Sequence, residues 1–455
     1  MRRPGIRSLA GGAAGIVAGV IGGIALTSIS VASGPTPAVP GLDAAHAPPL
    51  LTRPGEPVTL RYAIVCAPRD DGLPCEGSGS VYVRAGQTGP FRRLRLRRGA
   101  ESREGRYYVE LPRELASSRD GFSYYAVLRD GTTGAAMTVP AGGEAAPQRS
   151  FPLGEATEVD LGVHAFRADS PPDQRVVAAP WGSDPGEAGL AGSRELGFGG
   201  PSSFDVTPEG TVAVLDQVNG RVELWSHGGV KPTNVEVSGG LADFALEPGG
   251  AMDVLEPPSR TSPAPVLRSF RRDGTPRWAQ RLSDRTWAKL AVGPAGPIVQ
   301  QQPSEQWLPV AGRGAALSRA AQAAGGRPGR PFTNGREVLV ERVGVGELRL
   351  AELVGNAVLR SWRITSVTSL GEVQLAEPYG DRLVVVMKMY TADRSDYTVL
   401  VLDRAGVAAE FAVEPLEWAE SAPLARFRLA ASSLYRLGST RTGLFVDRFD
   451  LEVSP

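Results

Sequence analysis

A strand–glycine turn–strand pattern recurs through the second half of the chain. Residues 205–216 align with residues 245–256, and the alignment places Pro208 opposite Pro248 and Gly210 opposite Gly250. Weaker copies of the turn occur at Gly296, Gly335, Gly380 and Ser432. A repeat of about 40–50 residues built from short strands is typical of a β-propeller, because one small sheet cannot bury both of its faces alone. The repeat therefore predicts a ring of stacked sheets.

The amino-acid composition supports this prediction. The 455 residues include Gly 56 and Pro 38, which disfavour long helices and favour short strands joined by tight turns. Each repeat is expected to hold four strands, and in the first repeat these are residues 203–207, 211–215, 221–226 and 234–237. We expect an all-β chain whose only helix is a hydrophobic leader at the N-terminus.

The two ends of the repeat region indicate how the ring closes. Residues 194–198 look like an outer strand without its own sheet, and residues 443–451 look like a third strand that lacks a fourth. Pairing of these two segments would complete one sheet and seal the ring. The sequence thus predicts a six-bladed β-propeller over residues 193–455, with residues 154–192 as the linker that leads to it.

The first repeat resembles the NHL-repeat propeller family. Residues 204–225 follow that family's order of a glycine turn, an apolar strand, three polar positions and a strand that ends in an aromatic residue. The resemblance implies that Asp216, Asn219 and Arg221 brace the turn between the second and third strands. It also implies a partner-binding protein, although similar six-bladed shapes host lactonase-type and lyase enzymes.

Residues 57–153 carry the signature of a separate small domain. Apolar residues alternate with polar ones over 57–66, and further strand-like runs follow at 78–84, 91–98, 106–111, 122–129 and 136–139. Residues 121–131 resemble the late strand and turn of bacterial immunoglobulin-like and fibronectin-type domains. We therefore expect an immunoglobulin-like β-sandwich in front of the propeller.

The first 47 residues have the layout of an export signal. Three arginines precede an apolar run over residues 9–32, and small-x-small cleavage sites end at Ala32 and Ala47. The run is also long enough to span a bilayer as an uncleaved anchor. Both alternatives place the remaining chain outside the cytoplasm, secreted or anchored, with residues 48–56 as a linker.

The two cysteines fit an exported protein. Cys66 and Cys75 are the chain's only cysteines, and an even pair in an oxidising compartment is expected to form a structural disulfide. A redox or metal role would need a CxxC spacing or additional ligands, which the sequence lacks.

Two groups of residues are weak candidates for binding. Asp205, Asp243, Lys289 and Gln374 fall on the predicted inner strands of the propeller, where they could meet at the axis or simply be wetted by solvent. Arg93, Arg95 and Arg97 point the same way if residues 91–98 form one strand, and such a stripe suits anionic ligands or is only a solvated face. Arginine is the usual cation here, since Lys231, Lys289 and Lys388 are the only lysines.

The charge balance and the missing motifs reduce the number of possible functions. Lys+Arg 49 against Asp+Glu 49 gives no net charge, which argues against nucleic acid as a partner. Nucleophile-elbow, zinc-protease, phosphate-loop and dinucleotide motifs are absent. We expect a non-catalytic binding or scaffolding protein of the bacterial cell envelope that engages a protein or glycan and needs no cofactor. The alternative is an extracytoplasmic lactonase or polysaccharide lyase assisted by calcium.

Overall fold

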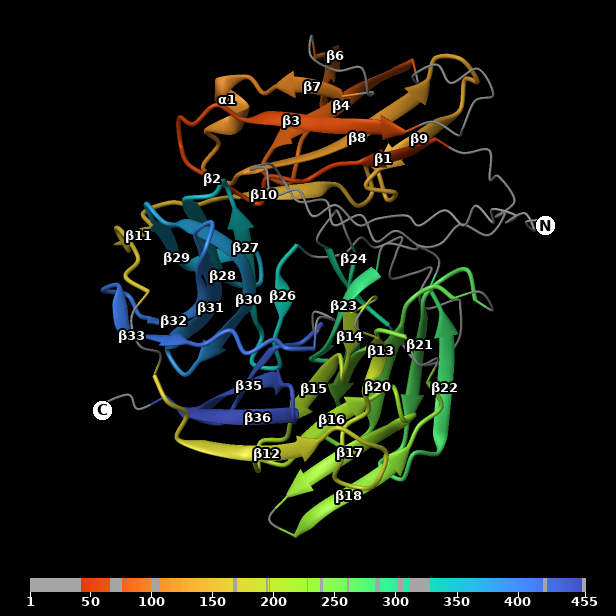
Figure 1. Cartoon of the computed structure of the whole chain (residues 1–455). Coiled ribbons are helices and arrows are strands. Elements are labelled where there is room, and N and C mark those ends of the chain that lie inside the picture. The colour runs from red at the N-terminus through yellow and green to blue at the C-terminus, as the bar shows by residue number, and fades with distance from the viewer. Residues whose placement is uncertain are drawn as a thin grey trace, which may run out of the picture. The chain divides into compact units, whose positions relative to one another are not determined.

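The chain is almost entirely β-structure in a computed structural model (Figure 1). The structure describes residues 42–65, 76–99, 106–166, 170–193, 195, 197–226, 228–237, 240–259, 262–282, 287–301, 306–310, 328–419 and 424–451. Within these ranges one short helix, α1 (Arg113–Ala116), accompanies the strands. No helix in the described ranges combines the length and the apolar character that a membrane span requires. Residues 9–32 and both cysteines, Cys66 and Cys75, lie outside these ranges.

The first module consists of two sheets. One sheet has the order β1 (Asp43–Ala45), β3 (Thr59–Val65), β7 (Arg106–Glu110), β6 (Arg97–Arg98). The other has the order β2 (Leu51–Thr52), β10 (Gln148–Pro152), β8 (Phe122–Asp130), β4 (Gly77–Ala85), β5 (Arg92–Arg95), with β9 (Ala136–Val139) also paired to β8. A shared core lies between them because each strand alternates buried and exposed residues, as Leu60, Tyr62 and Ile64 do in β3.

The arginine-rich segment 91–98 is not the single strand that the alternation predicted. β5 pairs with β4 in one sheet, whereas β6 pairs with β7 in the other. The chain changes sheets at Leu96, whose side chain is buried in the shared core. Burial of this one apolar residue explains why the strand breaks.

The N-terminal boundary of this module differs from the prediction. β1 lies within the predicted leader 1–47 and pairs with β3, and β2 lies within the predicted linker 48–56 and pairs with β10. His46 between them is buried, with Nδ1 2.7 Å from the Arg61 carbonyl oxygen and Nε2 2.8 Å from the Tyr124 hydroxyl. Residues 43–52 are therefore part of the folded module.

The rest of the chain is dominated by six sheets in which each strand pairs with its neighbour in sequence (Figure 1). We number them I to VI. Sheets I and II comprise β15 (Ser203–Val206), β16 (Val212–Asp216), β17 (Arg221–Ser226), β18 (Gly229–Asn234), and β19 (Asp243–Leu246), β20 (Met252–Glu256), β21 (Val266–Phe270), β22 (Pro276–Arg281). Sheets III and IV comprise β23 (Trp287–Gly293), β24 (Gly296–Gln301), β25 (Gln306–Pro309), and β26 (Arg330–Pro331), β27 (Arg336–Arg342), β28 (Glu347–Val354), β29 (Ala357–Thr365). Sheets V and VI comprise β30 (Ser369–Tyr379), β31 (Arg382–Tyr390), β32 (Ser395–Leu402), β33 (Val407–Val413), and β34 (Phe427–Ala430), β35 (Ser433–Thr440), β36 (Gly443–Asp450).

The repeated turn falls at the same place in every sheet, between the first and second strands. Five of the turns carry a glycine with positive φ, and the sixth carries Ala431 at φ 50°. These glycines are Gly210, Gly250, Gly296, Gly335 and Gly380. In sheet I the first three strands lie close to the expected ranges, but the fourth occupies Gly229–Asn234 rather than 234–237.

Apolar clusters join neighbouring sheets in sequence. Such clusters link sheets I and II, II and III, IV and V, V and VI, and also VI and I. Between sheets III and IV the described residues form no comparable cluster, and the Arg330 guanidinium lies 6.0 Å from the centre of the Trp307 ring. The first strands β15, β19 and β23 contact one another in turn, as do β30, β34 and β15. The fold is therefore β-propeller-like.

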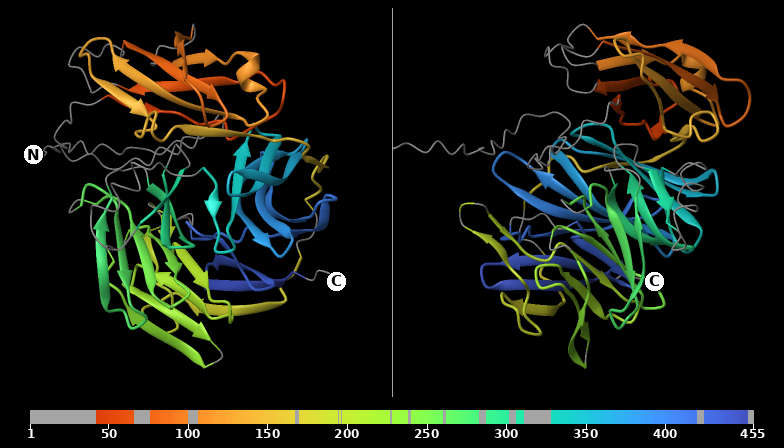
Figure 2. Two further views of the ribbon diagram at one scale, coloured as in Figure 1. Left: turned by 180° about the vertical axis from the view of Figure 1, so that it is seen from behind. Right: turned by 90° about the vertical axis from the view of Figure 1, so that its right-hand side faces the viewer.

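The closing strand comes from an unexpected segment. β36 pairs with β12 (Gln174–Pro180), which becomes the fourth strand of sheet VI (Figure 2). The end of the predicted closing segment 194–198 does not do this, because Gly197 and Phe198 belong to β14 (Gly197–Gly199), which pairs with β13 (Ala191–Ser193); Arg194 and Leu196 lie outside the described residues. The expected linker 154–192 thus supplies β12, and it also supplies β11 (Thr157–Asp160), which adds to β29 in sheet IV.

Candidate functional site

One end of the sheets gathers most of the polar side chains of interest. In each antiparallel sheet, the turn between the second and third strands lies at the end where the chain crosses to the next sheet. We call this end the connection face. The described residues of segments 181–202, 217–220, 235–242, 391–394 and 414–426 lie there.

Two of the sequence-predicted residues tie neighbouring sheets together. Asp205 on β15 accepts a hydrogen bond from the Leu246 backbone N–H in sheet II at 2.8 Å. Asp243 on β19 accepts one from the Leu290 backbone N–H in sheet III at 2.7 Å and another from the Ser203 hydroxyl at 2.8 Å. These carboxylates act as braces between the innermost strands.

Arg428 on β34 joins the two braces. Its guanidinium donates to the carbonyl oxygens of Phe204 and Phe244 and lies 3.6 Å from the Asp205 carboxylate and 3.9 Å from that of Asp243. Burial raises the pKa of Asp205, and Arg428 opposes that rise. Because their oxygens already accept from backbone N–H groups and, in Asp243, from the Ser203 hydroxyl, Asp205 and Asp243 are poorly placed to bind a ligand.

Lys289 and Gln374 belong to a different group. The Lys289 ammonium on β23 lies 3.7 Å from the Glu372 carboxylate on β30, and Gln374 is two residues further along β30. The Glu372 side chain is 66 % exposed, so this pair is accessible to solvent. The four predicted residues therefore divide into two braces and two partly exposed polar groups.

A cluster centred on Glu417 was missed by the sequence reasoning. The Tyr397 hydroxyl donates to the Glu417 carboxylate, which also lies 3.8 Å from the Lys388 ammonium and 3.5 Å from the Arg426 guanidinium. Burial is the main cause that raises the pKa of Tyr397; Arg426 opposes the rise, and Glu417 adds to it. Tyr397 thus stays neutral and acts as a hydrogen-bond donor near physiological pH.

The sequence held one signal for this cluster. Of the three lysines in the chain, two, Lys289 and Lys388, are in this polar region. Where arginine is the default cation, lysine offers a compact ammonium of different hydrogen-bonding geometry. Glu417 and Arg426 themselves lie in a connection without periodic pattern.

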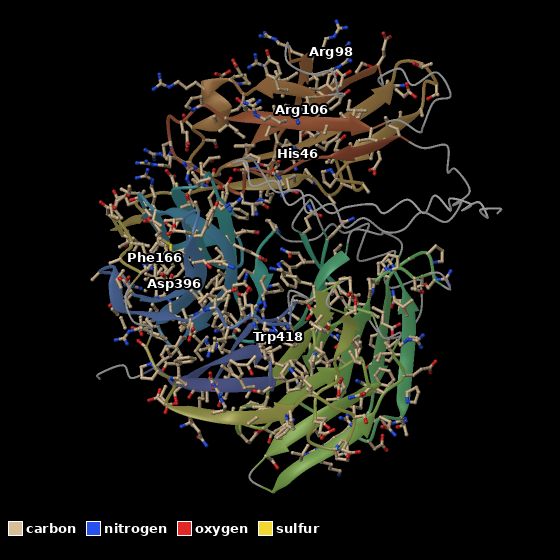
Figure 3. All side chains as sticks on the ribbon, in the orientation of Figure 1. His46, Arg98, Arg106, Phe166, Asp396 and Trp418 are labelled. Carbon is tan, nitrogen blue, oxygen red and sulfur yellow. The ribbon has the colours of Figure 1, made fainter. Side chains whose placement is uncertain are left out.

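Three aromatic side chains lie beside Glu417. The ring of Trp418, which is labelled in Figure 3, stacks on Phe198 with ring centres 5.0 Å apart, and its centre lies 6.1 Å from that of Trp181. Trp181 is held in place because its indole N–H donates to the Thr440 carbonyl oxygen at 3.0 Å. All three rings are partly exposed. We call Trp181, Phe198 and Trp418 the aromatic trio.

The predicted turn triplet meets on the same face. The Asn219 amide donates to the Asp216 carboxylate at 2.7 Å, and the Arg221 guanidinium lies 3.3 Å from it. Arg221 also donates to the carbonyl oxygens of Ser183, Asp184 and Glu187. The triplet therefore holds the turn after β16 against the segment that follows the closing strand, close to Trp181.

The arginines of the first module occupy two different sheets. Arg93 and Arg95 lie on β5, and Arg97 lies on β6 across the sheet change at Leu96. The Arg93 Nε donates to the Ser80 hydroxyl at 3.0 Å. All three side chains are exposed.

Two cavities accompany these features. One of about 20 Å³ lies against Glu417, Arg426 and Ser439, large enough for about one water molecule. Another of about 610 Å³ is lined by Arg149, Phe151, Asn356 and Arg360 among others, away from the connection face. None of the sequence-predicted residues lines the larger cavity. Among the described residues no group of three or more acidic, histidine or cysteine side chains gathers as a metal site would require.

Comparison with known proteins gives no family. No family model matches the chain, and no curated protein does. A protein of unknown function from Bacteroides thetaiotaomicron VPI-5482 is 10% identical, covers 90% of this chain and 98% of its own, and has a TM-score of 0.31. One from Bacteroides caccae is 12% identical over 47% of this chain and 82% of its own, with a TM-score of 0.29. Virginiamycin B lyase from Staphylococcus aureus is 9% identical over 59% of this chain and 89% of its own, with a TM-score of 0.23. These likenesses establish neither family nor function.

Proposed function

We propose that the chain is an exported, non-catalytic binding or scaffolding protein of the bacterial cell envelope. In this proposal an immunoglobulin-like β-sandwich precedes a six-bladed, NHL-type β-propeller, and the connection face engages a protein or a glycan. The six sequential sheets and the closing strand support the propeller part of the proposal. The two-sheet core of the first module supports the sandwich part.

The observation that carries the proposal is the aromatic trio beside the Glu417 cluster. Partly exposed tryptophan next to fixed charges is the composition of binding hot spots and of sugar-stacking surfaces. Two contacts hold Trp418 in place: its ring stacks on Phe198, and its backbone N–H donates to the Ser439 carbonyl oxygen. A surface fixed in this way loses little conformational freedom on binding.

Substitution of Trp418 tests this proposal. The probes are the cell-wall polysaccharide and the detergent-solubilised membrane proteins of the source cells, each passed separately over the immobilised chain. We expect Trp418→Ala to weaken retention of the bound component at least about tenfold. Trp278→Ala is the matched control, because this partly exposed tryptophan lies on β22, the outer strand of sheet II, and outside the segments of the connection face. Equal losses in both variants, or none in either, would contradict the proposal.

The alternative is a calcium-assisted lactonase or polysaccharide lyase. Tyr397, Glu417 and Lys388 supply a hydrogen-bonded phenol, a carboxylate and an ammonium, which are groups that acid–base chemistry uses. A rise in melting temperature on adding calcium, reversed by a chelator, would favour this alternative. A melting temperature unaffected by calcium favours the binding protein.

Export through residues 9–32 belongs to the same proposal. His46 and β1 are integral to the first module, so cleavage after Ala47 would remove a core side chain. We therefore expect a cleaved chain to begin at Ser33 and an anchored chain to keep residues 9–32. Mass spectrometry of the exported protein's N-terminal peptide checks this expectation, and a terminus at Pro48 would contradict it.

A further inference from the structure

The edge of the first module formed by β5 and β6 has a row of exposed guanidinium groups. Among the described strands, β5 pairs with β4 alone and β6 pairs with β7 alone, so residues 92–98 form the rim of both sheets. At about 3.3 Å per residue this rim is about 20 Å long. We call Arg93, Arg95, Arg97 and Arg98 the arginine edge.

No acid among the described residues of the module pairs with the charges of this edge. Among the described residues, Arg95, Arg97 and Arg98 form no ion pair, and Arg93 donates only to the neutral Ser80 hydroxyl. Arg92 differs, because its guanidinium pairs with Glu114 at 2.8 Å. Since the whole chain has no net charge, this local excess of positive charge is not a consequence of its composition.

Each half of the edge has a tyrosine beside it. Arg93 lies opposite Tyr82, whose ring stacks on Tyr125 with centres 4.8 Å apart. Arg97 lies opposite Tyr108, which has Arg61 on its other side in β3. Both Tyr82 and Tyr108 are partly exposed. The acid on this face of β7, Glu110, is further along the strand, opposite Thr59.

We propose that the arginine edge binds an anionic polysaccharide. Guanidinium groups recognise carboxylate or phosphate substituents through paired hydrogen bonds, and tyrosine rings stack on the apolar faces of sugars. The row is long and turns from one sheet to the other, so it suits an extended chain that follows the rim. A membrane surface is flat and would reach only one of the two tyrosines. This site is independent of the connection face.

The test uses the exported chain and defined polymers. Alginate supplies a polyuronate, neutral dextran supplies sugar without charge, and polyphosphate supplies charge without sugar. Vesicles of phosphatidylglycerol and phosphatidylcholine represent a lipid surface. We expect binding to alginate, weakened by added salt, and no binding to dextran. Replacing Arg95, Arg97 and Arg98 together with alanine should weaken alginate binding at least about tenfold.

Matched variants make the result specific. Replacing Arg281, Arg404 and Arg441 with alanine removes the same charge from exposed positions outside the first module and should leave alginate binding within about twofold. Tyr108→Ala should weaken alginate binding about threefold or more, while Tyr108→Phe keeps the ring and should bind like the wild type.

Three outcomes would overturn the proposal. One is an equal loss of alginate binding in the two triple variants, which would show that binding depends on the total charge of the chain and not on the arginine edge. Another is polyphosphate binding as tight as that of alginate with no effect of Tyr108→Ala. The third is binding to the anionic vesicles but not to alginate. Circular dichroism of every variant separates lost binding from lost folding.

Discussion

At the scale of single residues, Asp253 shows how a buried acid can act against stability. It lies on β20 with a fully buried side chain, and neither carboxylate oxygen has a hydrogen-bond partner among the described residues. Burial raises its pKa to about 7 and the nearby Glu247 adds to the rise, which the Ser269 hydroxyl and Arg277 oppose. The folded protein therefore holds a proton on Asp253 at a pH where the unfolded chain has released it.

This arrangement predicts a pH-dependent stability. Because the folded pKa exceeds the unfolded value of 3.8, the contribution of Asp253 is greatest below about pH 4 and falls until about pH 7. Asp253→Asn should remove that fall, so its free energy of unfolding should exceed that of the wild type by roughly 2–4 kcal/mol at pH 8. Urea denaturation at pH 5 and pH 8 measures the difference. Asp381→Asn, at an exposed position, is the control, and an equal gain there would count against this account.

At the scale of elements, the hairpin turns carry the repeat. Five turns use glycine at positive φ, a conformation that costs a residue with a Cβ about 1–2 kcal/mol. The sixth turn uses Ala431 at φ 50°, the only non-glycine residue at positive φ in the described chain. What repeats is therefore the backbone conformation of the turn, and the sixth sheet keeps this conformation although alanine replaces glycine there.

Two opposite substitutions test this view. Gly380 has open space around its missing Cβ, so Gly380→Ala should cost only backbone strain and lower stability by about 1 kcal/mol. Ala431→Gly should raise stability by about 0.5–1 kcal/mol. Denaturant midpoints measure both effects. Shifts in the same direction for both variants would refute the explanation.

At the scale of the whole molecule, β12 completes sheet VI with a strand from outside the repeats. β12 brings Val177 into the apolar cluster between sheets VI and I, and Arg175 pairs with the fully buried Asp447 at 2.8 Å. β12 (residues 174–180) and its partner β36 (residues 443–450) are far apart in sequence. Closure therefore makes the stability of sheet VI depend on a segment that precedes sheet I.

A carboxylate placed on either side of β12 tests the closure. Val177 is buried against the cluster, so Val177→Asp should lower the stability by at least about 3 kcal/mol and broaden or split the thermal transition. Ala178 is the next residue and is exposed, so Ala178→Asp should change the stability by no more than about 0.5 kcal/mol. Calorimetry of the two variants checks the contrast, and similar transitions would argue against closure through β12.

Local patterns account for the parts of the fold and site that could be predicted. The turn glycines and the alternation within strands act over a few residues, so the hairpins could be placed from residues such as Gly210 and Gly250. Asp243 could be placed on a first strand for the same reason, but its hydrogen bond to Leu290 depends on how sheets II and III pack. The break at Leu96 also depended on packing, because one buried leucine outweighed the alternation around it.

By itself, the sequence determined an all-β chain of repeated strand–turn–strand units, because backbone preference and side-chain alternation are short-range properties. Only the tertiary structure decided that β12 rather than residues 194–198 completes sheet VI, since several strands of similar pattern could pair with an open edge. It also decided that Glu417 meets Tyr397, Lys388 and Arg426, because their distances depend on how distant connections pack and on no local periodicity.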